Sequence, residues 1–148
     1  MPRPAGSRLK GRVEMHSRKE TAYNIVGILP GVDIKASAET VMIGAHYDHL
    51  GHGGVSSLSG GSHEVHCGAD DNASGTAGVL ALARELANRP RTARGVAFAL
   101  FSGEEMGLLG SLYWVKNPTL PLARIKAMLN MDMLGRTETD EISVYCGV

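Results

Sequence analysis

The chain has 148 residues, of which 43% are hydrophobic and 20% charged, and its formal net charge is zero. A chain of this length can bury about 70% of its unfolded surface in one domain. The balanced charge and the low aromatic content argue against a nucleic-acid-binding surface. No apolar run approaches the roughly 20 residues of a membrane span, and residues 1–11 contain no segment typical of a signal peptide.

Residues 1–20 are polar, irregular and locally basic, and we expect a solvated arm there rather than a binding patch. The rest of the chain alternates apolar runs with Gly, Pro and polar turn signals, which predicts an α/β layered domain. A Gly/Ser-rich surface loop is expected over residues 51–62. Strands are predicted over residues 22–29, 41–45, 95–101, 127–131 and 142–146, and helices over residues 74–88 and 107–116.

Acidic and histidine residues recur where these predicted elements begin or end. Functional sites of α/β sheets collect at the carboxyl ends of the strands. Charged groups near a core are costly unless something compensates them, and a pair of divalent metal ions would do so. The sequence therefore predicts a metallohydrolase. The candidate site residues are His46, Asp48, Asp70, Glu104, Glu105 and Asp132.

Several of these residues have a simpler interpretation when taken singly. Asp48, two residues after His46, could fix the tautomer of a metal-bound imidazole or make an ordinary surface hydrogen bond. Asp70 and Asp71 could cap a helix, or Asp70 could bridge two cations.

The adjacent Glu104 and Glu105 could form a solvated turn. Alternatively, one could bind metal while the other moves the proton of a metal-bound water. Asp132 lies in an apolar context, where an unpaired carboxylate is rare.

The remaining histidines and the cysteines give weaker signals. His63 and His66 are three residues apart, so they do not form the helical HExxH zinc motif. His49 and His52 are expected to be loop residues near the mouth of the site. Cys67 and Cys146 are too few for a disulfide framework.

Taken together, four segments resemble the zinc-dependent exopeptidases related to bacterial leucyl aminopeptidase and aminopeptidase S. Glutamate carboxypeptidase II and the transferrin receptor share that fold. The resemblance covers about residues 22–135, and the order and spacing of the four motifs agree. The segments are AHYDHLG, CGADDNASGTAGVLALAREL, FALFSGEEMGLLGS and LNMDMLG.

The resemblance implies a three-layer α/β/α sandwich with a mixed, mostly parallel sheet. It also implies a pair of zinc ions, a peptide substrate and a secreted or periplasmic location. Glu104 would be the general base and acid, and Asp48 would orient His46. Four side chains would bind the metals: Asp70 bridging both, His46 and Asp132 on one, and Glu105 on the other.

The family's second metal takes another histidine from well downstream of the Asp132 motif, but this sequence has no histidine after His66. The closing elements of the family fold are also absent. We therefore expect residues 21–148 to be an amino-terminal part of the catalytic domain, truncated at the C-terminus.

The leading interpretation is a metal-dependent aminopeptidase. One alternative is a single-zinc enzyme like the glutaminyl cyclases, which share the fold. The other is a non-catalytic or inactive fragment that lacks the last metal-binding histidine. Metal stoichiometry and product analysis would separate the two catalytic interpretations.

Overall fold

The structure is a computed structural model that describes residues 10–16, 19–54, 57–59, 64–136 and 143–146. Its centre is a four-stranded sheet in the order β1-β3-β2-β4. The central strand β2 runs parallel to both β3 and β4, whereas β1 pairs antiparallel with β3. The expected mixed, mostly parallel sheet is thus confirmed. The strands are β1 (Ile25–Leu29), β2 (Thr40–His46), β3 (Gly95–Phe101) and β4 (Ile125–Asn130).

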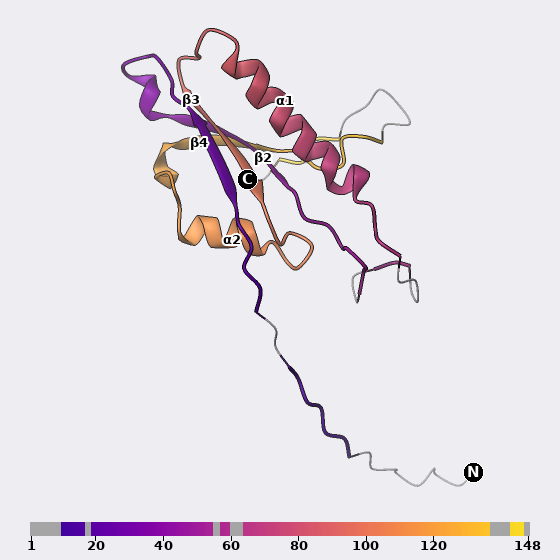
Figure 1. Ribbon diagram of the computed structural model, residues 1–148. Helices are drawn as coiled ribbons and strands as arrows, with labels where there is room; N and C mark the ends of the chain where they lie inside the picture. The colour runs from indigo at the N-terminus through magenta and orange to yellow at the C-terminus, as the bar shows by residue number, and fades with distance from the viewer. Residues whose placement is uncertain (1–9, 17–18, 55–56, 60–63, 137–142, 147–148) are drawn as a thin grey trace, which may run out of the picture.

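Two helices cover opposite faces of this sheet, α1 (Gly75–Ala87) and α2 (Leu109–Lys116) (Figure 1). A short π-helical segment, η2 (Ala69–Ser74), leads directly into α1, and its backbone is kinked at Asp71 and Asn72. Two further short 3-10 turns are η1 (Ala36–Ala38) and η3 (Leu122–Arg124). Helix, sheet and helix make three layers, as expected.

The two-residue period of a strand explains why both faces of the sheet are apolar. On β2, Ile43 and Ala45 pack in one cluster with Val79 of α1. Met42, the residue before Ile43, points to the other face and packs in a second cluster with Trp114 of α2. All seven residues of β3 are buried. Such a continuous apolar run is typical of a strand covered on both sides.

Most predicted elements agree with the structure to within a few residues, and the third predicted strand, residues 95–101, matches β3 at both ends. The fifth predicted strand is the exception. Residues 143–146 form no strand, and Ile142 lies outside the described residues. A β-branched, apolar run becomes a strand only when a neighbouring strand pairs with it, and the sequence pattern carries no information on that pairing.

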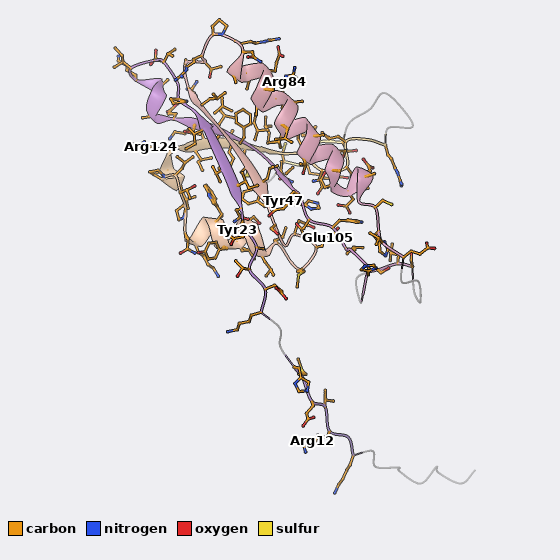
Figure 2. The ribbon with its side chains drawn as sticks, in the orientation of Figure 1. Arg12, Tyr23, Tyr47, Arg84, Glu105 and Arg124 are labelled. Atoms are coloured by element: carbon orange, nitrogen blue, oxygen red, sulfur yellow. The ribbon has the colours of Figure 1, made fainter. Side chains whose placement is uncertain are left out.

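The described residues 10–16 and 19–20 of the amino-terminal arm form no helix or strand and are exposed. They extend away from the sheet, as the position of Arg12 illustrates (Figure 2). In the described part of the chain, none of the helices has the length and apolar content that a bilayer crossing requires.

Trp114 is the main anchor of α2, and its replacement should destabilise the fold. Its ring is 5% exposed and meets Phe101 edge to face at a centroid distance of 6.3 Å, while its Nε1 donates to Thr119 Oγ1. We expect Trp114→Ala to lower the free energy of unfolding by about 3–5 kcal/mol. Leu112→Ala in the same helix should change it by less than about 1 kcal/mol, because Leu112 is 50% exposed. Urea unfolding followed by far-UV circular dichroism measures both, and equal losses would contradict this role for Trp114.

Candidate metal centre

Three parallel strands bring the candidate residues to one edge of the sheet. His46 is the last residue of β2, Glu104 and Glu105 follow β3, and Asp132 follows β4. The carboxyl ends of neighbouring parallel strands meet at one edge. The kinked segment η2 adds Asp71 to the same place. Within the described residues, the structure contains two groups of three potential metal ligands, and Asp71 belongs to both.

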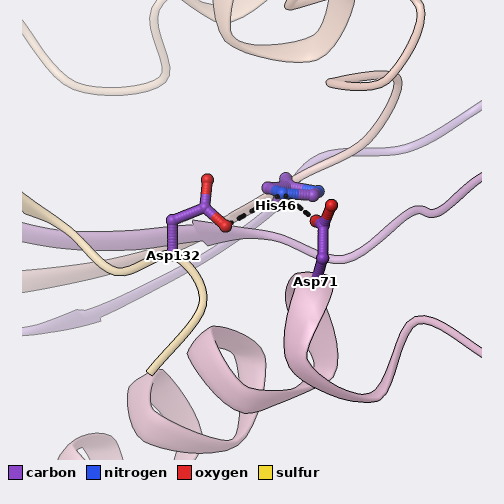
Figure 3. A group of neighbouring side chains, drawn as sticks. All are labelled: His46, Asp71 and Asp132. Atoms are coloured by element: carbon purple, nitrogen blue, oxygen red, sulfur yellow. Dashed lines mark ion pairs between the residues drawn. The ribbon is translucent and has the colours of Figure 1, made fainter. Parts of the chain in front are cut away.

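The first group consists of His46, Asp71 and Asp132 (Figure 3). His46 is 3% exposed, and its Nε2 lies 3.2 Å from Asp71 Oδ1 and 3.5 Å from Asp132 Oδ1. On the other side of the ring, Nδ1 lies 3.1 Å from the main-chain carbonyl oxygen of Asp48. A proton on Nδ1 donates to that carbonyl and leaves the Nε2 lone pair facing the two carboxylates.

The second group consists of His49, Asp71 and Glu105. His49 Nδ1 lies 2.7 Å from Glu105 Oε1 and 3.9 Å from Asp71 Oδ2. Glu105, in the loop after β3, thus contacts the loop after β2, which carries His49. All three side chains are partly buried.

The two oxygens of Asp71 therefore face different groups: Oδ1 lies near His46 and Oδ2 near His49. A carboxylate in this position can bridge two cations. Imidazole nitrogen and carboxylate oxygen are also the donor types that zinc prefers in catalytic sites. The residues present thus fit a pair of divalent metal ions.

Asp70, the residue expected to bridge the metals, belongs to neither group. Its Oδ1 accepts a hydrogen bond of 2.6 Å from the Gly135 main-chain N–H, and its buried Oδ2 lies 3.9 Å from Arg136 Nε. Among the residues that the structure describes, Oδ2 has no hydrogen-bond partner. The geometry therefore favours Asp71 over Asp70 as the bridging side chain and assigns Asp70 to the support of the segment after β4.

Residues close to Asp70 in sequence also make hydrogen bonds to the segment after β4. Ser74 Oγ accepts from the Leu134 N–H, and Asn72 Nδ2 donates to the Met131 carbonyl. The first turn of α1 also lies close to the backbone after β4, since a Cβ atom at Gly75 would lie 2.5 Å from the Met131 carbonyl oxygen. Contacts on both sides of Asp132 thus hold this aspartate toward His46.

The Asp48 side chain accepts hydrogen bonds from the backbone of Glu104 and Glu105, in addition to lying near the His46 imidazole. Its Oδ1 accepts from the Glu104 N–H at 3.1 Å, and its Oδ2 accepts from the Glu105 N–H at 3.3 Å. Its carboxylate is 3.7 Å from His46 Nδ1, which is farther than the Asp48 main-chain oxygen. Asp48 therefore contacts His46 through its backbone and fixes the loop after β3 through its side chain.

Glu104 lies at the edge of the first group, with Oε2 3.9 Å from His46 Nε2. Burial raises the pKa of the Glu104 carboxyl above its ordinary value, although His46 acts in the opposite direction. Three neighbouring carboxylates raise the pKa further: those of Glu105, Asp132 and Asp48. A raised pKa favours a carboxylate that both accepts and returns a proton.

Comparisons with known proteins identify the family of this chain. Residues 24–146 match the profile of peptidase family M28. The chain belongs to this family. It is 36% identical over 141 residues to a probable leucine aminopeptidase of Trichophyton verrucosum, covering 89% of this chain and 34% of the relative. It is 33% identical over 134 residues to a probable lipoprotein aminopeptidase of Mycobacterium tuberculosis, covering 87% and 24% respectively.

Among solved structures, the chain is similar to a zinc aminopeptidase of Bacillus subtilis. The TM-score is 0.59 at 35% identity, over 76% of this M28 chain and 24% of the solved one. The chain thus spans about a third or less of the length of the relatives it matches.

The sequence alone does not single out two residues of these groups, Asp71 and His49. Asp71 was interpreted only as a possible cap, because two adjacent aspartates give no signal for which of them faces the strand ends. His49 was interpreted as a loop residue, although its position three residues after His46 keeps it near the end of β2. His63 lies outside the described residues, and His66 Nε2 lies 3.0 Å from Ser57 Oγ.

The two aspartates should respond differently to substitution. Asp71→Ala removes a carboxylate from both groups, so we expect divalent cation affinity to fall by more than about 100-fold. Asp70→Ala should keep affinity within about 10-fold. It should instead lower the free energy of unfolding by about 1–3 kcal/mol, because the Gly135 N–H loses its acceptor. Calorimetric titration with Zn²⁺ and urea unfolding test these outcomes. A larger affinity loss in the Asp70 variant would restore Asp70 as the bridge.

Proposed function

We propose that the protein is part of a zinc-dependent aminopeptidase that hydrolyses the first peptide bond of a peptide through a dinuclear site. The observation that carries the proposal is the double role of Asp71, whose two oxygens face His46 and His49 separately. Membership of the M28 family and the aminopeptidase names of the relatives support the same activity.

In this proposal His46, Asp71 and Asp132 would hold one zinc ion, and Asp71 and Glu105 would hold the other. Zinc in such a site would polarise the scissile carbonyl and lower the pKa of a bound water. The hydrogen bond between His46 and the Asp48 carbonyl fixes the imidazole tautomer that leaves Nε2 free for a metal. Asp132 is held in place by the contacts of residues 70–75 with residues 131–135.

Glu104 is proposed as the general base and acid. Its carboxylate is partly exposed and close to the first group without belonging to it, so it is free to meet a substrate. It would take the proton of the attacking water and then deliver that proton to the nitrogen of the leaving amine. Asp48 supports this role because it holds the main-chain N–H groups of both glutamates.

The single-zinc alternative predicts a different metal content. An Asp71 carboxylate with one oxygen toward each group favours two metals over one. Zinc analysis of the protein, with identification of the released amino acid or cyclised product, separates a peptidase from a cyclase.

We also propose that the enzyme works outside the cytoplasm, either secreted or periplasmic. The name of the mycobacterial relative, a probable lipoprotein aminopeptidase, supports this location. Cell fractionation with an antibody against the protein tests it, and recovery only with cytoplasmic markers would contradict it.

The two neighbouring glutamates should be separable by mutation. We expect Glu104→Gln to retain zinc and lower kcat by about 10²–10⁴-fold, because an amide cannot accept the proton of water. Glu105→Ala should lose zinc as well as activity. Zinc content and hydrolysis of a leucine anilide are measured in a polypeptide that extends to the full length of the M28 relatives.

Glu85→Gln is a matched control, since Glu85 lies on the exposed face of α1 in an ion pair with Arg89. It should leave both zinc content and turnover unchanged. Equal zinc loss in the Glu104 and Glu105 variants would reject the division of roles between them.

A further inference from the structure

The second group contains a histidine to which the proposed zinc pair has not yet assigned a role. His49 Nδ1 faces two carboxylates at once, at 2.7 Å from Glu105 Oε1 and 3.9 Å from Asp71 Oδ2. One donor nitrogen and two carboxylate oxygens within 4.8 Å of one another match the nitrogen and oxygen donor set of a zinc site. We propose that His49 is a direct ligand of the second metal, through Nδ1, which deepens the proposed dinuclear function and rests on it.

The spacing of these atoms suits a metal ion bound between them. Ligands at about 2.0–2.1 Å from a tetrahedral zinc ion lie roughly 3.3 Å apart. The distance between His49 and Glu105 would lengthen slightly on metal binding, whereas the distance between His49 and Asp71 would shorten. Movements of about 0.6 Å are within the reach of partly buried side chains at the ends of loops.

The backbone around His49 is arranged to keep the ring in this place. Gly68 approaches the ring so closely that a Cβ atom there would lie 2.8 Å from His49 Cγ, and its φ of +61° is one that glycine adopts freely. On the other side, Asp48 binds the N–H groups of Glu104 and Glu105, which ties the loop of His49 to the loop of Glu105.

The second group is also open to solvent and substrate. A pocket of about 270 Å³ lies beside it, and both His49 and Asp71 line this pocket. The described residues His49, Asp71 and Glu105 would therefore give such a metal three ligands and leave it a face toward the pocket, as a catalytic zinc site requires.

A purely structural hydrogen bond between His49 and Glu105 is the competing explanation. In that case His49 would only orient Glu105, and a variant would weaken metal binding without changing the number of imidazoles on the metal. The number of coordinated imidazoles therefore distinguishes a ligand from a positioning residue.

The test compares wild type, His49→Ala and His49→Gln, with His16→Ala as the control. His16 lies in the exposed arm and belongs to neither group of potential metal ligands. Metal-free proteins are titrated with Zn²⁺, and X-ray absorption spectra of the Zn²⁺-loaded proteins report the imidazoles around the metal. We expect wild type and His16→Ala to bind two zinc ions. Both His49 variants should keep one ion and bind the second more than about 100-fold more weakly, with one imidazole lost per protein.

The outcomes separate the inference from the function on which it rests. Two tightly bound zinc ions in the His49 variants, or weakened binding with an unchanged imidazole count, would overturn the role of His49 and leave the dinuclear site intact. A wild type that binds no zinc would overturn the proposed function and this inference together. Far-UV circular dichroism checks folding, and the bulkier Gln variant is used if the Ala variant is misfolded.

Discussion

The crowding of negative charge at one sheet edge is the constraint on which the centre depends. Asp71, Glu105 and Asp132 lie around two histidines, with Glu104 and Asp48 next to them. Like-charged carboxylates this close repel one another, and burial adds a desolvation cost. Divalent cations would remove both costs at once. The fold therefore holds together a set of groups that would otherwise separate, which explains why so many main-chain contacts surround it.

Those contacts come from two independent supports. The Asp48 carboxylate connects the loops after β2 and β3, and residues 70–75 hold the segment after β4. Thr76 at the start of α1 adds a hydrogen bond to the His46 carbonyl. Each loop at the sheet edge is thus attached to a neighbouring element rather than left to its own conformation. Such preorganisation is what a metal site needs for high affinity.

Much of this arrangement could be predicted from sequence, because it depends on period and position. A run of seven apolar residues between polar ones predicts β3, and carboxylates directly after such runs fall at the carboxyl edge of a parallel sheet. Asp70 and Asp71 show the limit. They are identical in type and adjacent, and the non-helical backbone at Asp71 turns one toward His46 and His49 and the other toward Gly135. The direction of His49 likewise depends on the distant Gly68 and Glu105.

The position of the single tryptophan has a practical consequence. Trp114 packs on Phe101, the last residue of β3, and three residues further on the chain reaches Glu104. Its indole is buried between α2 and the strand that carries the glutamate loop. No other tryptophan contributes to the emission of this chain. The tryptophan fluorescence of this protein therefore reports on the packing of α2 against β3, the strand that leads to Glu104 and Glu105.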